Sequence, residues 1–419
     1  MKVLYCIPGL AINADAPWVT RQRAGGMVTA GLEVTLLVRR ESDRAYFRDL
    51  PCEILVEQPA AQGTERGVTR GSLRSFIWEP AVTQWRAFSV ARNMGADLLY
   101  FSHPEPWTLL PAVWLRHRRR HSPAVSVFST SVYRHLGDAS MYPPATRIRG
   151  WLNQLATWCL CPRVNVLFDN QHVPQFFWRQ DGVACNVLHD GYRAGLAGSS
   201  RVTSRQRLDL PPERRILLSF GVPSKAKGQD LLLEALRGLE PTFDVYLVGP
   251  VGGVYGDPRQ MATDLLAGGW RGHLHFVARH VSDDEMSDYF CAADGVVLPY
   301  RHGFVSTSGN FRMAVEYGRA VVAADQFFIG EMVRRHQLGL LFPPGDVPAL
   351  RAKLTAFGRQ PAAWFEQIEQ HCRALATQES WAVVGGRYRA LFEQLLACRS
   401  AGSQPGPHGY PCGQSESRL

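Results

Sequence analysis

The stretch Ile216–Leu236 reads ILLSFGVPSKAKGQDLLLEAL, and its pattern recurs through the chain. Its first residues, Ile216–Phe220, are mainly apolar and have the length of a buried β-strand. Gly221 follows the strand, a short loop carries two lysines, and an amphipathic segment begins at about Asp230. A strand, a loop and a helix in this order form the repeat of a parallel sheet that is covered by helices.

Strand-like and helix-like segments alternate on both sides of residue 200. In the first half we expect strands at Val3–Ile7, Glu33–Val38, Asp97–Phe101, Ala124–Phe128, Val164–Phe168 and Asn186–His189. In the second half we expect them at Ile216–Phe220, Asp244–Val248, Leu274–Val277, Gly295–Leu298, Ala320–Ala323 and Leu340–Phe342. A chain of 419 residues is also too long for one ordinary domain. We therefore predict an α/β protein with two Rossmann-like, doubly wound domains that face a cleft.

The domain boundaries follow from the changes in composition. Residues 194–212 are polar, rich in Gly, Ser and Arg, and end in two prolines, which is typical of an interdomain linker. We predict an N-terminal domain over 1–193, a C-terminal domain over 213–380, and a helix over 381–399 that returns to the first domain. We expect the tail 400–419, rich in Gly, Pro, Ser and Gln, to be disordered.

Composition restricts the class of protein. Hydrophobic residues make up 46% and charged residues 20%, as in ordinary globular proteins, and no apolar run is long enough to span a bilayer. We interpret the apolar start, Met1–Gly9, as a buried strand and not as a signal peptide. Nine scattered cysteines without a disulfide framework indicate reduced thiols and a cytoplasmic location. The net charge of +9 favours anionic partners.

The densest basic run is Arg116–His121, which reads RHRRRH and follows an apolar stretch with Trp107 and Trp114. One interpretation is a solvated helix end, where cations interact favourably with the helix dipole. The other is a peripheral contact with an anionic membrane surface, made by Arg116, Arg118, Arg119 and Arg120. No recognition motif surrounds the run, so nucleic acid is not a predicted partner.

Two loops carry residues that suit a phosphate. Lys225 and Lys227 lie just beyond the strand Ile216–Phe220, where ligands of parallel sheets bind, although solvated loop lysines give the same pattern. The second loop, Ser306–Asn310, opens a helix whose free amides favour a phosphate, and Gly309 permits close backbone approach. Plain helix capping by Ser or Thr is the competing interpretation of that loop.

Taken together, these elements resemble the C-terminal domain of glycosyltransferase family 4, a large retaining family of GT-B fold. They occur in order as Phe220-Gly221, Lys227-Gly228, Leu298-Pro299-Tyr300, Thr307-Ser308-Gly309, Ala314 with Gly318, Val321-Val322 and Gly339–Asp346. The resemblance covers about residues 215–395. It is weaker in the first half, where Ala30–Val34 and His189–Tyr192 are similar to family segments.

The resemblance implies an enzyme that moves a hexose from a nucleotide-diphosphate sugar to a glycan, lipid-linked or small-molecule acceptor, as in polysaccharide biosynthesis. It implies no cofactor, and no Asp-x-Asp sequence or His cluster suggests a metal site. By the same resemblance, Lys227 binds the donor pyrophosphate. Val222 stands where the family often has an arginine, and Lys225 is the candidate to substitute for that arginine. The other residues expected at the donor are Gly221, Thr307, Ser308, Gly309, Asn310 and Glu316.

Two features depart from the family pattern or leave it open. The family's Glu-x7-Glu pair falls on Val305 and Met313, neither of which is acidic. Glu316 lies one helical turn after Met313 and has two interpretations: a contact with a ribose hydroxyl, or a surface residue. A family histidine near the end of an N-terminal strand approaches the donor sugar, and the candidates for this catalytic role are His103 and His135.

Three alternatives were weighed against this interpretation. A dehydrogenase would need Gly-x-Gly-x-x-Gly between a strand and a helix, and Gly249–Gly253 lacks that spacing. A sugar-nucleotide epimerase shares the two-domain architecture and would release free sugar. A catalytically silent relative would bind only a nucleotide or a partner, and the missing glutamates keep this alternative open.

Overall fold

The computed structural model describes residues 1–8, 16–58, 79–102, 104–116, 123–128, 144–161, 163–177, 186–196, 200–251 and 257–400. The chain divides into two compact units. Unit 1 comprises Met1–Gly191 and Trp381–Leu419, and unit 2 comprises Tyr192–Ser380. Each unit is built around one parallel sheet.

The sheet of unit 1 has seven strands in the order β3-β2-β1-β4-β5-β6-β7, all parallel. Its central strands are buried on both faces and read as continuous apolar runs, as expected where helices cover both sides of a parallel sheet. The strands are β1 (Lys2–Cys6), β2 (Glu33–Arg40), β3 (Glu53–Gln58), β4 (Leu98–Ser102), β5 (Ala124–Phe128), β6 (Asn165–Phe168) and β7 (Asn186–Val187).

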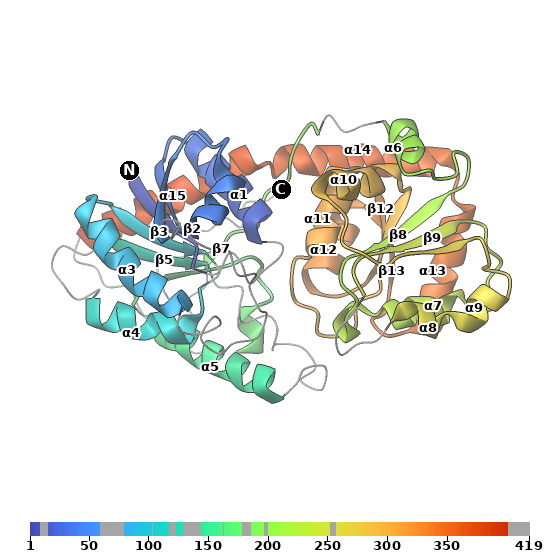
Figure 1. Cartoon of the computed structure of the whole chain (residues 1–419), viewed down its shortest axis with the longest axis horizontal. Coiled ribbons are helices and arrows are strands. Elements are labelled where there is room, and N and C mark those ends of the chain that lie inside the picture. Colours follow the sequence, from blue (N-terminus) through green and yellow to red (C-terminus); the bar gives the residue numbers. More distant parts are fainter. Residues whose placement is uncertain are drawn as a thin grey trace. The chain divides into compact units, whose positions relative to one another are not determined.

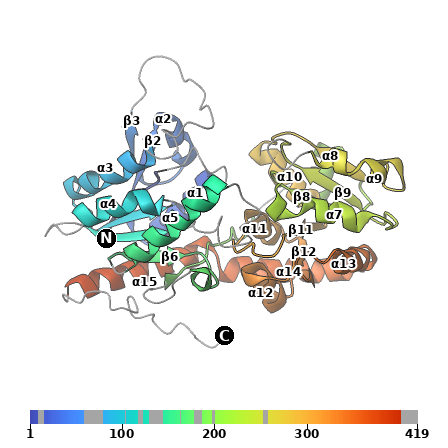
Figure 2. The same ribbon diagram turned by 90° about the horizontal axis from the view of Figure 1, so that it is seen from below.

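The helices of unit 1 lie on both faces of this sheet. α1 and α15 pack together on one face, and α3 and α4 lie side by side on the other (Figures 1 and 2). The elements are α1 (Ala16–Thr29), α2 (Glu41–Arg44), η1 (Ala45–Phe47), α3 (Glu79–Asn93), α4 (Pro106–Arg116), α5 (Pro144–Leu160), η5 (Pro174–Phe176) and α15 (Trp381–Ser400).

α15 completes the core of unit 1 from the far end of the chain. A Cβ atom at Gly385 would lie 1.9 Å from the carbonyl oxygen of Gly26, so α15 and α1 approach each other at backbone distance. The buried hydroxyls of Tyr100 and Tyr388 are 3.1 Å apart, and Tyr5 packs edge-on against Tyr100. A helix was expected over 381–399 and is observed over Trp381–Ser400; the tail beyond it lies outside the described residues.

The sheet of unit 2 has six parallel strands in the order β10-β9-β8-β11-β12-β13. The order reverses direction at β8, so the carboxyl ends of β8 and β11 form the switch point at which such sheets bind ligands. The strands are β8 (Ile216–Phe220), β9 (Asp244–Val248), β10 (Leu274–Val277), β11 (Gly295–Leu298), β12 (Ala320–Ala324) and β13 (Gly339–Phe342).

The helices of unit 2 also cover both faces: α7 and α8 lie on one side of the sheet, and α10 and α14 on the other (Figure 1). They are α6 (Arg201–Arg207), η6 (Lys225–Lys227), α7 (Gln229–Leu236), α8 (Pro258–Met261), α9 (Thr263–Ala267), α10 (Asp283–Ala292), α11 (Gly309–Glu316), α12 (Phe327–His336), α13 (Val347–Arg359) and α14 (Ala362–Gln378). The predicted fold class, two doubly wound α/β domains, is confirmed.

Two elements differ from the sequence expectation. β3 was not expected, because only three apolar residues stand between Glu53 and Glu57 at the edge of the sheet. Within the expected linker 194–212 the structure has helix α6. The Ser200 hydroxyl caps this helix, and Arg205 binds the Asp294 carboxylate at 2.8 Å. The polar residues of this segment therefore attach it to unit 2, to which it belongs.

Candidate functional site

The loop after β8 forms a tight turn that presents Lys227. The turn η6 is closed by the Ser224 hydroxyl, which accepts a hydrogen bond from the Lys227 amide at 3.3 Å. Gly228 follows with a φ of 65°, and a Cβ there would lie 2.0 Å from the Pro299 carbonyl oxygen. Only glycine fits this left-handed position against the loop that follows β11.

Two side-chain nitrogens converge over the bare backbone of Gly221, at the carboxyl end of β8. A Cβ on Gly221 would lie 3.0 Å from Nζ of Lys227 and 3.9 Å from Nδ2 of Asn310. Asn310 also donates a hydrogen bond from Nδ2 to the Phe220 carbonyl at 2.7 Å, which fixes the strand end. Gly221 thus leaves space beside an ammonium and an amide, an arrangement suited to an anionic group.

Arg301 joins the two loops, and sequence reasoning missed it. Its guanidinium donates to both carboxylate oxygens of Asp230, at 2.9 and 2.6 Å, and to the Lys225 carbonyl at 2.6 Å. Its backbone amide donates to the Ala226 carbonyl at 3.0 Å. Arg301 therefore holds the lysine turn in place. The available signal was its position directly after the Pro299-Tyr300 pair that follows β11.

The start of α11 has an unusual backbone angle at its capping residue. Ser308 has a positive φ of 62°, and Gly309 does not have a positive φ. The Ser308 hydroxyl accepts from the Phe311 amide at 3.3 Å and lies 2.9 Å from the Tyr300 hydroxyl. Among the described residues, only Arg312 Nη2 would lie within 4 Å of a Cβ on Gly309, at 3.9 Å. The first helical residue is therefore open to a ligand, and Thr307 precedes this turn.

Glu316 does not lie at the helix start. It ends α11, about 12 Å along the axis from Ser308. Its carboxylate is buried and accepts from the backbone amide of Arg193 at 3.0 Å and from its Nε at 2.8 Å. Burial raises the pKa of Glu316, and Arg193 opposes that shift. The Glu316 carboxylate thus pairs with Arg193 in this structure, whereas the sequence suggested a contact with a ribose hydroxyl.

The remaining expected residues have distinct surroundings. Lys225 is exposed, whereas Lys227 is half-buried. Val305 and Met313, at the positions of the family's acidic pair, are buried apolar side chains. His103 and His135 lie outside the described residues. Among the residues that the structure describes, no group of three or more His, Cys, Asp or Glu side chains could hold a metal ion.

Residues 214–358 match the family model described as glycosyl transferases group 1. The chain has the GT-B fold and resembles glycosyltransferase family 4. It is 30% identical over 214 residues to D-inositol 3-phosphate glycosyltransferase 1 of Catenulispora acidiphila, across 45% of this chain and 49% of that protein. It is 28% identical over 174 residues to phosphatidyl-myo-inositol mannosyltransferase of Mycobacterium leprae, across 42% and 45%. The chain spans about half the length of the curated relatives it matches.

Solved GT-B structures resemble the chain over almost its whole length. Sucrose-phosphate synthase from Thermosynechococcus elongatus superposes with a TM-score of 0.70 at 17% identity, covering 95% of this chain and all of that one. Anabaena HepE, solved with UDP, has a TM-score of 0.65 at 17% identity, with coverage of 93% and 99%. At these identities the likeness concerns the fold. Together with the family model, it confirms the resemblance inferred from the sequence motifs.

Proposed function

We propose that this chain is a metal-independent, retaining glycosyltransferase that moves a sugar from a nucleotide-diphosphate donor to a glycan, lipid-linked or small-molecule acceptor. The observation that carries the proposal is the convergence of Lys227 Nζ and Asn310 Nδ2 over Gly221, at the carboxyl ends of β8 and β11. The donor belongs to unit 2 in this proposal, and the acceptor belongs to unit 1. The names of the relatives, two glycosyltransferases of inositol compounds, support the reaction class.

The proposed chemistry requires stabilisation of negative charge. The bond between the sugar C1 and the phosphate oxygen breaks, the acceptor oxygen bonds to C1, and the acceptor proton passes to the departing diphosphate. The electron pair of the broken bond stays on the nucleoside diphosphate. In this proposal Lys227, Asn310 and the backbone amides at the start of α11 stabilise that charge, which their convergence near Gly221 and the α11 N-terminus supports.

The experiment is a panel of nucleoside diphosphates in a thermal-shift assay, followed by assays of donor hydrolysis and transfer. A nucleotide at a hundred times its dissociation constant stabilises the protein by about 2.7 kcal/mol, which is readily measured. Transfer or slow donor hydrolysis supports the proposal. Nucleotide binding without either reaction identifies a silent relative, and release of free sugar with epimerisation identifies an epimerase.

The start of α11 gives a prediction about backbone shape. Ser308→Ala is expected to lower the free energy of unfolding by about 1–3 kcal/mol, because it removes the helix cap and leaves the buried Tyr300 hydroxyl without Ser308. Ser308→Gly loses the same hydroxyl but relieves the positive φ, so it should cost less. Denaturant unfolding of both variants measures the difference. If Ser308→Gly lowered the free energy of unfolding as much as Ser308→Ala or more, this prediction would be wrong.

Gly309→Val tests the ligand at the same turn. The space around Gly309 is open, so the variant is expected to fold. Its branched side chain would occupy the space that we assign to the diphosphate, and nucleotide affinity and turnover should both fall. Full activity in the folded variant would show that the diphosphate does not bind at the start of α11.

We also propose a peripheral contact of unit 1 with an anionic membrane on the cytoplasmic side. α4 and α5 pack against each other and expose four large apolar side chains: Trp114 and Leu115 on α4, and Ile148 and Trp151 on α5. The basic run begins where α4 ends, and Arg118, Arg119 and Arg120 lie outside the described residues. Apolar insertion beside a basic segment is typical of interfacial helices. No helix within the described part of the chain combines the length and the apolar character needed to cross a bilayer.

Vesicle sedimentation tests the membrane contact. Replacing Arg116, Arg118, Arg119 and Arg120 with glutamine is expected to weaken binding to anionic vesicles at low salt by about 1 kcal/mol per residue. Trp151→Ser should weaken binding further at every salt concentration. Val202→Ser, at an equally exposed position of unit 2, is the matched control. Unchanged binding of the four-residue variant at low salt would end the proposal.

A further inference from the structure

A second cavity lies within unit 2, away from the lysine turn. Its volume is about 1060 Å³, which is ample for a small-molecule ligand. Its walls come from the segment after Tyr192, from α6, from residues 212–215, from the end of α11 and from α14. Neither Lys227 nor Asn310 lines it. The cavity is therefore separate from the proposed donor site.

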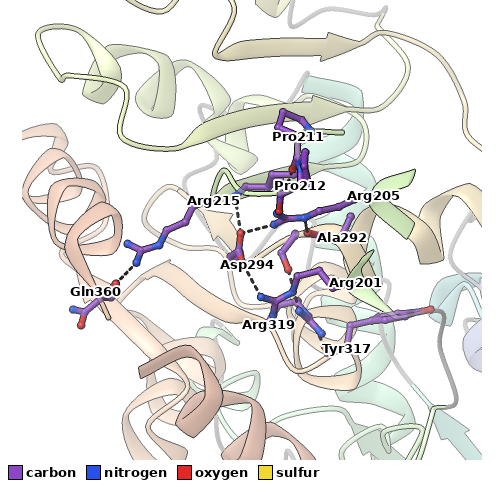
Figure 3. Close-up of polar contacts among 12 residues, drawn as sticks. Arg201, Arg205, Pro211, Pro212, Arg215, Ala292, Asp294, Tyr317, Arg319 and Gln360 are labelled. Atoms are coloured by element: carbon purple, nitrogen blue, oxygen red, sulfur yellow. Dashed lines mark hydrogen bonds and ion pairs between the residues drawn. The ribbon is translucent and has the colours of Figure 1, made fainter. Parts of the chain in front are cut away.

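Positive charge predominates in these walls, which contain seven arginines and five carboxylates. The less exposed carboxylates already have partners, as Figure 3 shows for Asp294. Asp294 accepts from Arg201 and Arg205, each at 2.8 Å, and its Oδ2 also accepts from the Ile216 amide at 2.8 Å. The buried Glu316 is paired with Arg193, and the partly exposed Glu369 is paired with Arg373. The last two carboxylates are exposed.

Two arginines of the wall, Arg319 and Arg215, have no ion pair with a carboxylate among the described residues, and Arg319 is the more buried. Arg319 is 6% exposed, and within the described part of the chain it donates only to backbone carbonyls: from Nη1 to Ala293 at 3.1 Å and from Nε to Tyr317. Its Nη2 has no hydrogen-bond partner among the described residues. Burial, together with the neighbouring charge of Arg201, lowers the pKa of Arg319 to about 10. A buried guanidinium in this state is stabilised by an anion.

Arg215 is held in a similar way on the opposite side of Asp294 (Figure 3). It donates to the carbonyls of Phe357, at 3.3 Å, and of Gly358 and Gln360. Planar guanidinium groups bind phosphoryl oxygens by paired hydrogen bonds, and they do so more strongly in a site of low dielectric. Within the described residues, the wall thus has two arginines, Arg215 and Arg319, whose hydrogen bonds all go to neutral carbonyls, and Arg201 lies near Arg319.

We propose that this cavity binds a small phosphate-bearing anion through Arg319 and Arg201, independently of the donor. Its ligand is an inorganic phosphate or the phosphoryl group of an organic phosphate. The site shares unit 2 with the donor site but uses none of its residues. Binding would add a counter-charge to Arg319 and fix α6, through Arg201, against the end of α11.

The test uses the full chain saturated with its best nucleoside diphosphate, so that the donor site is occupied. Inorganic pyrophosphate and glycerol 3-phosphate are titrated by calorimetry, with sodium sulfate adjusted to equal ionic strength as the reference. Saturable binding of either probe is expected. Tighter binding of glycerol 3-phosphate indicates an organic phosphate as the ligand, and tighter binding of pyrophosphate indicates an inorganic one; both support the proposal.

Variants locate the binding. Arg201→Gln and Arg319→Lys are expected to weaken pyrophosphate binding roughly tenfold or more, because each changes a charge-assisted hydrogen bond. Arg334→Gln, at an exposed arginine of unit 2 outside the cavity, should leave it unchanged. Retained nucleotide affinity reports that the variants are folded. Hydrogen exchange of wild-type α6, slowed by pyrophosphate, gives a readout that needs no variant.

Three results would overturn the proposal: pyrophosphate binding that disappears when nucleotide is saturating, binding that both cavity variants retain in full, or an absence of protection in α6. In the first case the probe occupies the donor site, and the proposed function itself is unaffected.

Discussion

Glu316→Gln is expected to lower the free energy of unfolding of unit 2 by about 3–5 kcal/mol. The Glu316 carboxylate is fully buried, and its three contacts with Arg193 are 2.7 to 3.0 Å long. The glutamine leaves the Arg193 guanidinium, which is itself only one-fifth exposed, without its counter-charge. Breaking a buried pair is costly because the remaining charge stays desolvated. Hydrogen exchange of the α11 amides measures the change within unit 2.

Glu369→Gln is the matched control for this prediction. Glu369 pairs with Arg373, whose side chain is 75% exposed, and such surface pairs contribute about 0–1 kcal/mol. The double replacement Arg193→Met with Glu316→Leu should recover much of the loss, since no unpaired charge remains. Equal small effects at Glu316 and Glu369 would show that the buried pair does not stabilise unit 2.

Lys227→Ala is expected to weaken binding of the nucleoside diphosphate by about 1.5–3 kcal/mol, or roughly 10- to 150-fold. Nζ of Lys227 lies over Gly221 in a half-buried position, where a charge-assisted hydrogen bond to a phosphate is poorly screened by solvent. Lys225→Ala is the natural control. Its side chain is exposed, and the turn holds this residue through its backbone carbonyl and Arg301.

Calorimetric titration of both variants with the nucleoside diphosphate shows which of the two lysines binds the phosphate. The structure favours a large loss for Lys227→Ala and little change for Lys225→Ala. Near-zero changes in affinity for both variants would show that the phosphate does not bind at this loop. A larger loss for Lys225→Ala would mean that the exposed lysine closes over the ligand.

Strands with continuous apolar character were predictable from the sequence. The expected ranges for β5, β8, β9, β10 and β11 coincide with the observed ones. β3 and α6 were missed for opposite reasons. β3 is an edge strand whose three apolar residues are flanked by acidic ones, and α6 is polar because Ser204 and Arg205 are buried against acidic partners in unit 2. Local composition does not contain that tertiary information.

The candidate site was predictable only where its residues lie close together in the sequence. Lys227 and Gly221 belong to one turn, and the Ser308–Asn310 helix start is a contiguous motif. The pairing of Arg193 with Glu316 joins residues 123 positions apart, and that of Arg205 with Asp294 spans 89. No spacing or motif in the sequence indicates either of these two pairs. Helical periodicity placed Glu316 near the family's acidic position but could not show that its carboxylate already had a partner.

The position of α15 has a consequence for the order in which the molecule is made. The strands of unit 1 leave the ribosome first, yet their core includes Trp381, Val384 and Tyr388, which are synthesised after all of unit 2. Unit 2 is contiguous and has its own sheet, so it can fold as soon as it emerges. Nascent unit 1 must wait for α15, and until then the side of α1 that packs against α15 stays uncovered. While α15 is still inside the ribosome, chaperones would therefore meet a folded unit 2 and an unfinished unit 1.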